Sequence, residues 1–205
     1  MIKKIIFALC ACASYSAYGQ NIDSKKLLTD IQVLSSDVYE GRRTGTKENQ
    51  MAADYIVKRF KDLGLKSYKA DYRHPFTFKG RGDKETSGVN LLAYIKGKSR
   101  ETVVVTAHYD HVGIQRSLIY NGADDNASGV SPLLAFAEYF SKNKPEKTII
   151  FAALDAEEMG LQGAKAFVAA PPVKIEQIKL NLNMDMISHN DKGELYVAGT
   201  LPYPH

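Results

Sequence analysis

Cysteine is scarce in this chain of 205 residues and tryptophan is absent, since there are two cysteines and no tryptophan. Both cysteines, Cys10 and Cys12, lie near the N-terminus in a segment that we expect to be removed. A mature chain without thiols has no disulfide framework, no thiolate nucleophile and no cysteine-based zinc site. Any metal ion in the mature protein must therefore be held by histidine and by carboxylates.

Long apolar runs are missing too. The N-terminal run, Ile5 to Ala13, follows two lysines and is too short to cross a bilayer. Ala17 and Gly19 are small residues at the two positions that signal peptidase inspects. We therefore predict that residues 1–19 are a signal peptide, cleaved before Gln20, and that the protein is periplasmic or secreted. No later segment is apolar and long enough to span a membrane.

The same segment has a second interpretation. Leu9-Cys10-Ala11-Cys12 resembles a loose lipobox, which would make Cys12 a lipid anchor. The apolar run before it is short, so we rank this interpretation second.

The chain has only a small net charge. The formal net charge is +4, and removing Lys3 and Lys4 from the 27 basic residues leaves 25 against 23 acidic residues. A nucleic-acid-binding surface requires clustered basic residues, and the sequence has no such cluster. We therefore expect no nucleic-acid partner.

From residue 90 onward, apolar strand candidates alternate with helical patterns. The expected strands are 90–95, 103–107, 148–154, 180–184 and 194–197, and the expected helices are 22–34, 46–63, 130–140 and 163–169. Pro132 suits only the first turn of its helix, and Pro75 argues against a central strand in residues 72–81. The alternation predicts an α/β fold, a three-layer sandwich whose mixed, mostly parallel central sheet is flanked by helices.

Acidic and imidazole side chains gather where the predicted strands end. The four clusters are His108-Tyr109-Asp110-His111, the loop Gly122 to Gly129, the segment Asp155 to Gly160, and Asp185. In open α/β sheets, ligands bind beyond the carboxyl ends of the strands, so we expect the four clusters to converge on one crevice. Each cluster alone would more often be a helix cap, a turn or a hydrogen-bonded core histidine, but four in succession favour a shared site.

The composition of these clusters points to a metal. Carboxylates gathered in one place repel one another and raise one another's pKa. A divalent cation bound among them neutralises this repulsion. One imidazole with several carboxylates and no sulfur suits zinc, manganese or cobalt in a hydrolytic role. Two adjacent metals need a bridging carboxylate and a shared water, and a carboxylate that binds no metal can accept the proton of that water.

The clusters resemble the co-catalytic zinc exopeptidases, a family that includes bacterial leucyl aminopeptidase, aminopeptidase Y and glutamate carboxypeptidase II. The matching segments are His108-Tyr109-Asp110, Gly122-Ala123-Asp124-Asp125-Asn126-Ala127-Ser128-Gly129, Asp155-Ala156-Glu157-Glu158-Met159-Gly160-Leu161 and Asn183-Met184-Asp185-Met186, together with Leu34 to Gly45 upstream. The resemblance covers nearly all of residues 30–200, and the order of the four motifs makes it specific. It implies a metallo-exopeptidase, foremost an aminopeptidase acting on peptides with two zinc ions.

The resemblance implies a ligand set. His108 and Asp185 would bind one metal, Glu158 would bind the second, and Asp125 would bridge the two. Asp124 is the alternative bridge if the alignment is shifted by one residue.

The resemblance also implies the catalytic roles. Glu157 would be the general base, which takes a proton from the metal-bridging water and passes it to the leaving amine. Asp110 would hold the other nitrogen of His108 and thereby fix its tautomer.

The family pattern needs one further histidine on the second metal, from a loop well beyond Asp185. The remaining histidines, none in that context, are His74, His111, His189 and His205. We therefore expect residues 20–205 to be a catalytic domain that is incomplete at its C-terminal end, lacks the family's last strands and helices, and exposes apolar sheet surface. The first metal would keep all its protein ligands, and the second would keep only Asp125 and Glu158.

Two other functions are compatible with these residues. A non-catalytic or single-metal remnant of the fold would bind metal or peptide weakly. A glutaminyl-cyclase-like relative would use one zinc ion, although His108 argues against it because Asp125 and Glu158 alone would then be expected. The motifs do not fix the side-chain preference or the oligomeric state.

Overall fold

The computed structural model describes residues 22–188 and 190–199. The predicted signal peptide, His189 and His205 lie outside the described residues, so cleavage before Gln20 stays a prediction that N-terminal sequencing of the purified protein tests. The helices are α1 (Ser24–Leu34), α2 (Lys47–Asp62), α3 (Ser128–Lys142) and α4 (Gln162–Ala169), with short helical turns η1 (Asp37–Tyr39), η2 (Arg81–Asp83), η3 (Ala123–Ala127) and η4 (Ile175–Gln177). The strands are β1 (Lys66–Ser67), β2 (Arg73–Lys79), β3 (Glu85–Ile95), β4 (Thr102–His108), β5 (Gly113–Gln115), β6 (Leu118–Tyr120), β7 (Thr148–Leu154) and β8 (Ile178–Asn183).

Six of the strands form one mixed sheet. Its order is β1-β3-β7-β4-β8, and β2 pairs with another part of β3. Strand β4 is parallel to β7 and β8, whereas β3 is antiparallel to β1, β2 and β7. The expected mixed α/β sheet flanked by helices is confirmed, with a smaller parallel part than expected. The physical reason is that β2 and β3 are joined by a short turn, which allows only antiparallel pairing.

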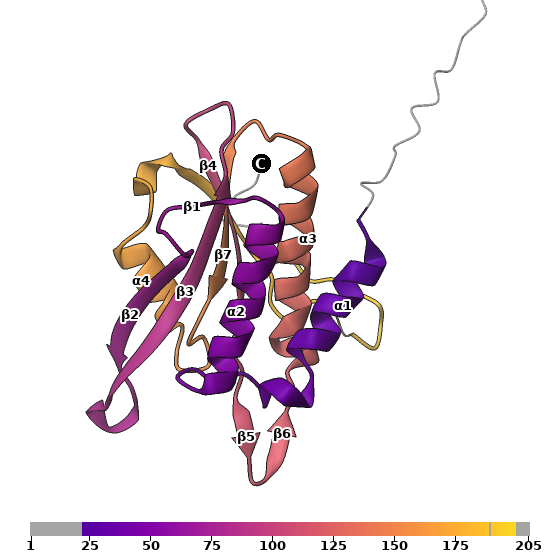
Figure 1. Cartoon of the computed structure of the whole chain (residues 1–205), viewed down its shortest axis with the longest axis vertical. Coiled ribbons are helices and arrows are strands. Elements are labelled where there is room, and N and C mark those ends of the chain that lie inside the picture. The colour runs from indigo at the N-terminus through magenta and orange to yellow at the C-terminus, as the bar shows by residue number, and fades with distance from the viewer. Residues whose placement is uncertain (1–21, 189, 200–205) are drawn as a thin grey trace, which may run out of the picture.

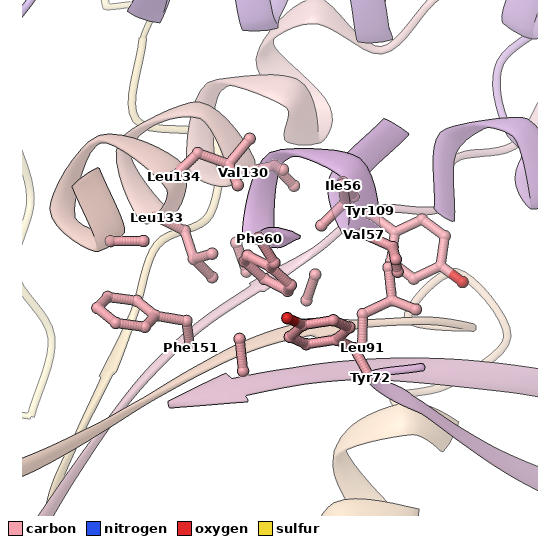
Figure 2. Packing of buried hydrophobic residues seen from close by; sticks show 14 of the residues in the cluster. Ile56, Val57, Phe60, Tyr72, Leu91, Tyr109, Val130, Leu133, Leu134 and Phe151 are labelled. Atoms are coloured by element: carbon pink, nitrogen blue, oxygen red, sulfur yellow. The ribbon is translucent and has the colours of Figure 1, made fainter. Parts of the chain in front are cut away.

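Helices cover both faces of this sheet, with α2 and α3 on one side and α4 on the other (Figure 1). Neighbouring residues of a strand belong to different hydrophobic cores because their side chains point to opposite faces of the sheet. On β3, for example, Leu91 packs on the α2–α3 side and Leu92 on the α4 side. Figure 2 shows the larger core, in which Phe60 of α2, Leu133 of α3 and Phe151 of β7 are buried together.

Helix α2 begins and ends as the sequence predicts. The backbone N–H of Asn49 donates a hydrogen bond of 3.1 Å to the hydroxyl of Thr46, which therefore caps the helix. Beyond its last turn, Gly64 has a φ of +64°, the left-handed conformation that ends many helices. Ala52, Ile56 and Phe60 form the buried face between these two ends.

Three segments differ from the expected elements. Strand β2 does contain Pro75, which is tolerated because β2 pairs only with β3 among the described strands and so lies at an edge. Helix α3 begins at Ser128, two residues earlier than expected, so Pro132 is its fifth residue rather than part of the first turn. The strand expected at 194–197 is wrong, because these residues pair with no strand in the described part of the chain and Tyr196 is 76% exposed.

Strand β8 is an edge of the described sheet and carries exposed apolar side chains. Leu180 is 56% exposed and Leu182 is 43% exposed, in agreement with the expected apolar sheet surface. Across residues 22–188 and 190–199, no helix has both the length and the apolar character that a membrane span requires.

Candidate metal centre

The carboxyl ends of β7, β4 and β8 meet at one edge of the sheet because these neighbouring strands are parallel. His108 is the last residue of β4 and pairs with Leu154, the last residue of β7. Glu157 and Glu158 follow β7 after two further residues, and Asp185 follows β8 after one. The strand register therefore brings three of the four clusters together.

The fourth cluster reaches this edge through the loop that precedes α3. Asn126 is fully buried there, donates a hydrogen bond of 3.0 Å to the carbonyl oxygen of Met184 and accepts one of 3.2 Å from the backbone N–H of Met186. These two contacts tie the loop to the chain on either side of Asp185. As a result, Asp125 lies next to the ends of β4 and β8.

Asp124 lies differently from its neighbour. One of its carboxylate oxygens accepts hydrogen bonds from the backbone N–H of Ser188 at 3.1 Å and from the Ser188 hydroxyl at 2.7 Å. Asp124 therefore anchors the segment after β8, and the geometry favours Asp125 as the aspartate of the centre.

Two groups of side chains in the described residues could each hold a metal ion. In the first group, Nε2 of His108 lies 3.2 Å from Oδ1 of Asp125 and 3.4 Å from Oδ1 of Asp185. In the second group, Nδ1 of His111 lies 2.8 Å from Oε1 of Glu158 and 3.6 Å from Oδ2 of Asp125. Tetrahedral ligands at ~2.0–2.2 Å from a zinc ion are about 3.4 Å apart. The first group has this spacing, whereas the 2.8 Å contact in the second group is a hydrogen bond between His111 and Glu158.

Asp125 belongs to both groups, and each of its oxygens faces one of them. Each group offers one imidazole and two carboxylates without sulfur, a donor set that suits zinc. The motifs predicted His108, Asp125, Asp185 and Glu158 for these positions. They did not predict His111, which the structure adds to the second group.

Asp110 is fully buried beneath the two groups. Nδ1 of His108 donates to the backbone carbonyl of Asp110 at 3.2 Å, which leaves Nε2 as the nitrogen that can bind a metal, and the Asp110 carboxylate lies 3.6 Å from the same Nδ1. That carboxylate also accepts hydrogen bonds from the backbone N–H groups of Glu157 at 3.0 Å and Glu158 at 3.3 Å. Asp110 therefore orients both His108 and the loop of the two glutamates.

The two consecutive glutamates face different cavities. Glu157 lines a cavity of about 410 Å³ together with His108 and Asp185. Glu158 lines a second cavity with Asp110 and His111. Glu157 thus lies beside the first group without belonging to either, whereas Glu158 is part of the second group.

The concentrated negative charge changes the pKa of the groups in the crevice. Burial would lower the pKa of His108, but the carboxylates of Asp110, Asp125 and Asp185 outweigh it and raise the pKa to about 10. Burial raises the pKa of Glu157 and of Glu158, and neighbouring carboxylates raise both further. The same negative field favours a bound cation.

Arg42 is a buried residue of the centre to which the motifs gave no role. Its side chain is the anchor of the surrounding loops, because Nε donates to the carbonyl oxygen of Tyr109 at 2.9 Å, Nη1 to that of Asn121 at 2.7 Å and Nη2 to that of Gly122 at 3.0 Å. Burial lowers the pKa of Arg42 to about 10, while nearby carboxylates oppose that shift, so the guanidinium remains charged at neutral pH. Arg42 thereby joins the end of β4 to the loop that carries Asp125.

We expect Arg42→Lys to destabilise the protein by roughly 2–4 kcal/mol, because an ammonium group cannot reproduce the planar fork and leaves buried carbonyls without a donor. Urea unfolding followed by circular dichroism measures this change. Arg43→Lys is the matched control, since Arg43 is exposed and should change stability by less than about 0.5 kcal/mol. Equal stabilities of the two variants would contradict the anchoring role.

Comparison with known proteins shows a sequence match to a peptidase family. The sequence profile of Peptidase family M28 matches residues 90–202. The alkaline phosphatase isozyme conversion protein of Escherichia coli is 26% identical over 168 residues, which are 75% of this chain and 49% of that protein. The vacuolar membrane protease of Schizosaccharomyces pombe is 30% identical over 161 residues, which are 73% of this chain and 18% of that protein. The chain therefore spans about half or less of the length of these relatives.

Solved structures share the fold at low sequence identity. A glutaminyl cyclase from Porphyromonas gingivalis has a TM-score of 0.72 at 19% identity, with 82% of this chain and 62% of that chain covered. A Zn-dependent exopeptidase from Parabacteroides distasonis has a TM-score of 0.70 at 19% identity, with the same coverage. A zinc aminopeptidase from Bacillus subtilis has a TM-score of 0.69 at 17% identity, with 82% of this chain and 70% of that chain covered.

Proposed function

The chain belongs to peptidase family M28, and on that premise we propose that it is a zinc-dependent aminopeptidase, which releases N-terminal residues from peptides. The observation that carries the proposal is the position of Asp125, whose two oxygens face two different groups of metal-ligating side chains. A carboxylate shared in this way is what a two-metal hydrolase requires. In the proposal, His108, Asp185 and Asp125 hold one zinc ion, and Asp125 and Glu158 belong to the site of the second.

Zinc bound at these residues supplies Lewis acidity, which polarises the scissile carbonyl and makes water more acidic. Glu157 supplies the acid–base function. Its carboxylate lines the same cavity as His108 and Asp185 without belonging to either metal group, so it can accept and donate a proton there. Glu157 accepts a proton from the attacking water and delivers it to the amine that leaves.

The cavity beside Glu157 favours an apolar substrate side chain. Most of its wall is aliphatic or aromatic, and includes Leu161, Phe167, Val168 and Ile175. Binding cavities of this kind take up apolar groups, while a few polar groups fix the orientation of the ligand. We therefore propose a preference for aliphatic N-terminal residues such as leucine.

Hydrolysis of amino-acyl nitroanilides tests the proposal. We expect the zinc-loaded protein to cleave the leucyl compound faster than the lysyl and glutamyl compounds, to lose this activity when a chelator removes the metal and to regain it when zinc is returned. Peptides with N-terminal glutamine test the second candidate, glutaminyl cyclase, which the shared fold with the Porphyromonas gingivalis enzyme favours. Cyclisation without nitroanilide cleavage would replace the proposal, and a zinc-loaded protein with neither activity would favour a non-catalytic remnant.

A further inference from the structure

The cavity beside Glu158 is the larger of the two that meet at the metal centre. Its volume is about 920 Å³, near the upper end of the range of about 300–1,000 Å³ that is usual for ligand pockets. Asp155 lines this cavity as well as the apolar one beside Glu157, so the two are neighbours on either side of the glutamate pair.

A peptide substrate has parts for both cavities. In the proposed aminopeptidase reaction, one residue precedes the scissile bond and the rest of the peptide follows it. When the first side chain occupies the apolar cavity and the scissile carbonyl lies at the metal centre, the chain beyond it continues into the cavity beside Glu158. The inference below therefore rests on the proposed function and concerns the part of the substrate that this function leaves open.

Two β-hairpins and the loop before α2 form the outer part of the larger cavity. The β2–β3 hairpin contributes residues on both sides of its turn, and β5 contributes Gln115. Both hairpins project at the same end of the molecule (Figure 1). The backbone N–H of Gly113 donates a hydrogen bond of 3.2 Å to the carbonyl oxygen of Gly41, which ties the base of β5 to the loop that carries Arg43.

Three cationic side chains line this outer part of the cavity, and they are Arg43, Lys79 and Lys84. All three residues are exposed. Among the residues that the structure describes, none of the three forms a salt bridge. Their charges are therefore available to a ligand.

The acidic residues of the cavity do not cancel this charge. Glu85 is the cross-strand neighbour of Lys79 and offsets one of the three cations. Asp110 and Asp155 are buried and accept hydrogen bonds from within the protein, and Glu158 belongs to the second metal group. The outer part of the cavity therefore keeps a net positive charge, which attracts anions and binds them through charge-assisted hydrogen bonds.

We propose that this cavity binds the residues after the scissile bond, and that Arg43, Lys79 and Lys84 make it select a carboxylate there. The carboxylate belongs either to an acidic side chain or to the C-terminus of a short peptide, since both offer the same charge and the same planar pair of oxygens. The preferred substrate then combines an apolar first residue with an acidic remainder.

Binding of hydrolysis-resistant peptides tests this preference without turnover. In these peptides a methylene-amine group replaces the first peptide bond, and the three compounds are leucyl-glutamyl-alanine amide, leucyl-glutaminyl-alanine amide and leucyl-glutaminyl-alanine with a free C-terminus. Isothermal titration calorimetry on the zinc-loaded protein should show that a carboxylate increases affinity about 3–10-fold over the glutaminyl amide, and that salt reduces this difference. A gain for the glutamyl amide assigns the site to an acidic side chain, and a gain for the free acid alone assigns it to the C-terminus.

Neutralising the three cations together should abolish the difference in affinity. Leucyl nitroanilide has no amino-acid residue beyond the scissile bond, so the variant Arg43→Gln/Lys79→Gln/Lys84→Gln should cleave it as fast as the wild type. Equal affinities of the wild type for all three peptides, or an unchanged preference in this variant, would overturn the inference.

The triple variant Lys61→Gln/Lys66→Gln/Lys144→Gln is the matched control. It removes the same net charge at exposed lysines that line neither cavity, so it should keep the preference for a carboxylate. Loss of the preference in this control as well would assign it to the overall charge of the protein and contradict the inference. A wild type that selects carboxylates but cleaves no substrate contradicts only the aminopeptidase proposal, whereas cleavage of leucyl nitroanilide without this selectivity contradicts only the present one.

Discussion

Replacing Glu157 with glutamine will reduce the turnover of leucyl nitroanilide by about 10²–10⁴-fold, while the zinc content stays at the wild-type value. Glutamine keeps the size and polarity of the side chain but cannot accept a proton from the attacking water. Glu157 lines the cavity of His108 and Asp185 without belonging to either metal group, so its replacement removes no ligand. Measuring kcat together with metal content on the same preparation separates these two effects.

Glu158→Gln is the matched control, since it makes the same chemical change one residue further along the chain. Glu158 lies 2.8 Å from His111 in the second metal group, so this variant should lose zinc as well as activity. If Glu157→Gln loses zinc and Glu158→Gln keeps it, the assignments of the base and the ligand must be exchanged.

The sequence predicts the fold, and it predicts that His108 and Asp185 lie at the same edge of the sheet, because both depend on short-range patterns. The apolar runs at 103–107 and 148–154 form the neighbouring parallel strands β4 and β7, and adjacent parallel strands must end at the same edge of the sheet. Polar residues placed directly after such strands are therefore brought together by the register alone. This is the physical reason why the sequence alone predicts His108 and Asp185 at one site.

The second metal group and the anchoring of the loops could not be predicted in the same way. The position of His111 depends on how the chain turns after β4, and nothing in the spacing of the motif fixes that turn. Arg42 donates hydrogen bonds to four carbonyl groups, those of Leu34, Tyr109, Asn121 and Gly122. The last three are far from it in the sequence, and none of the four has a residue-specific signal. A Cβ atom at Gly122 would lie 2.3 Å from the carbonyl oxygen of Asp125 and 2.7 Å from atoms of Arg42 and His111, and only the structure reveals such close packing.

Asp125→Asn will have the largest effect on metal binding, because it changes the one residue that both groups share. Each oxygen of Asp125 faces a different imidazole, so a neutral amide weakens both sites at once, whereas the loss of any other ligand affects one. Binding to the native state stabilises a protein by about 2.7 kcal/mol per site when free zinc is 100-fold above Kd. In a chain of this size that corresponds to a rise in melting temperature of about 5–10 °C per site.

The melting temperature of the wild type should therefore rise strongly with zinc, and that of Asp125→Asn should hardly change. Differential scanning calorimetry at several zinc concentrations measures this difference without any assay of activity. Asp124→Asn is the control, because the Asp124 carboxylate accepts hydrogen bonds from Ser188 and its replacement should leave the response to zinc intact even if the protein becomes less stable. If Asp124→Asn abolishes the zinc-dependent rise in melting temperature and Asp125→Asn preserves it, Asp124 is the bridging residue. The position of Asp125 between the two imidazoles would then have no role in metal binding.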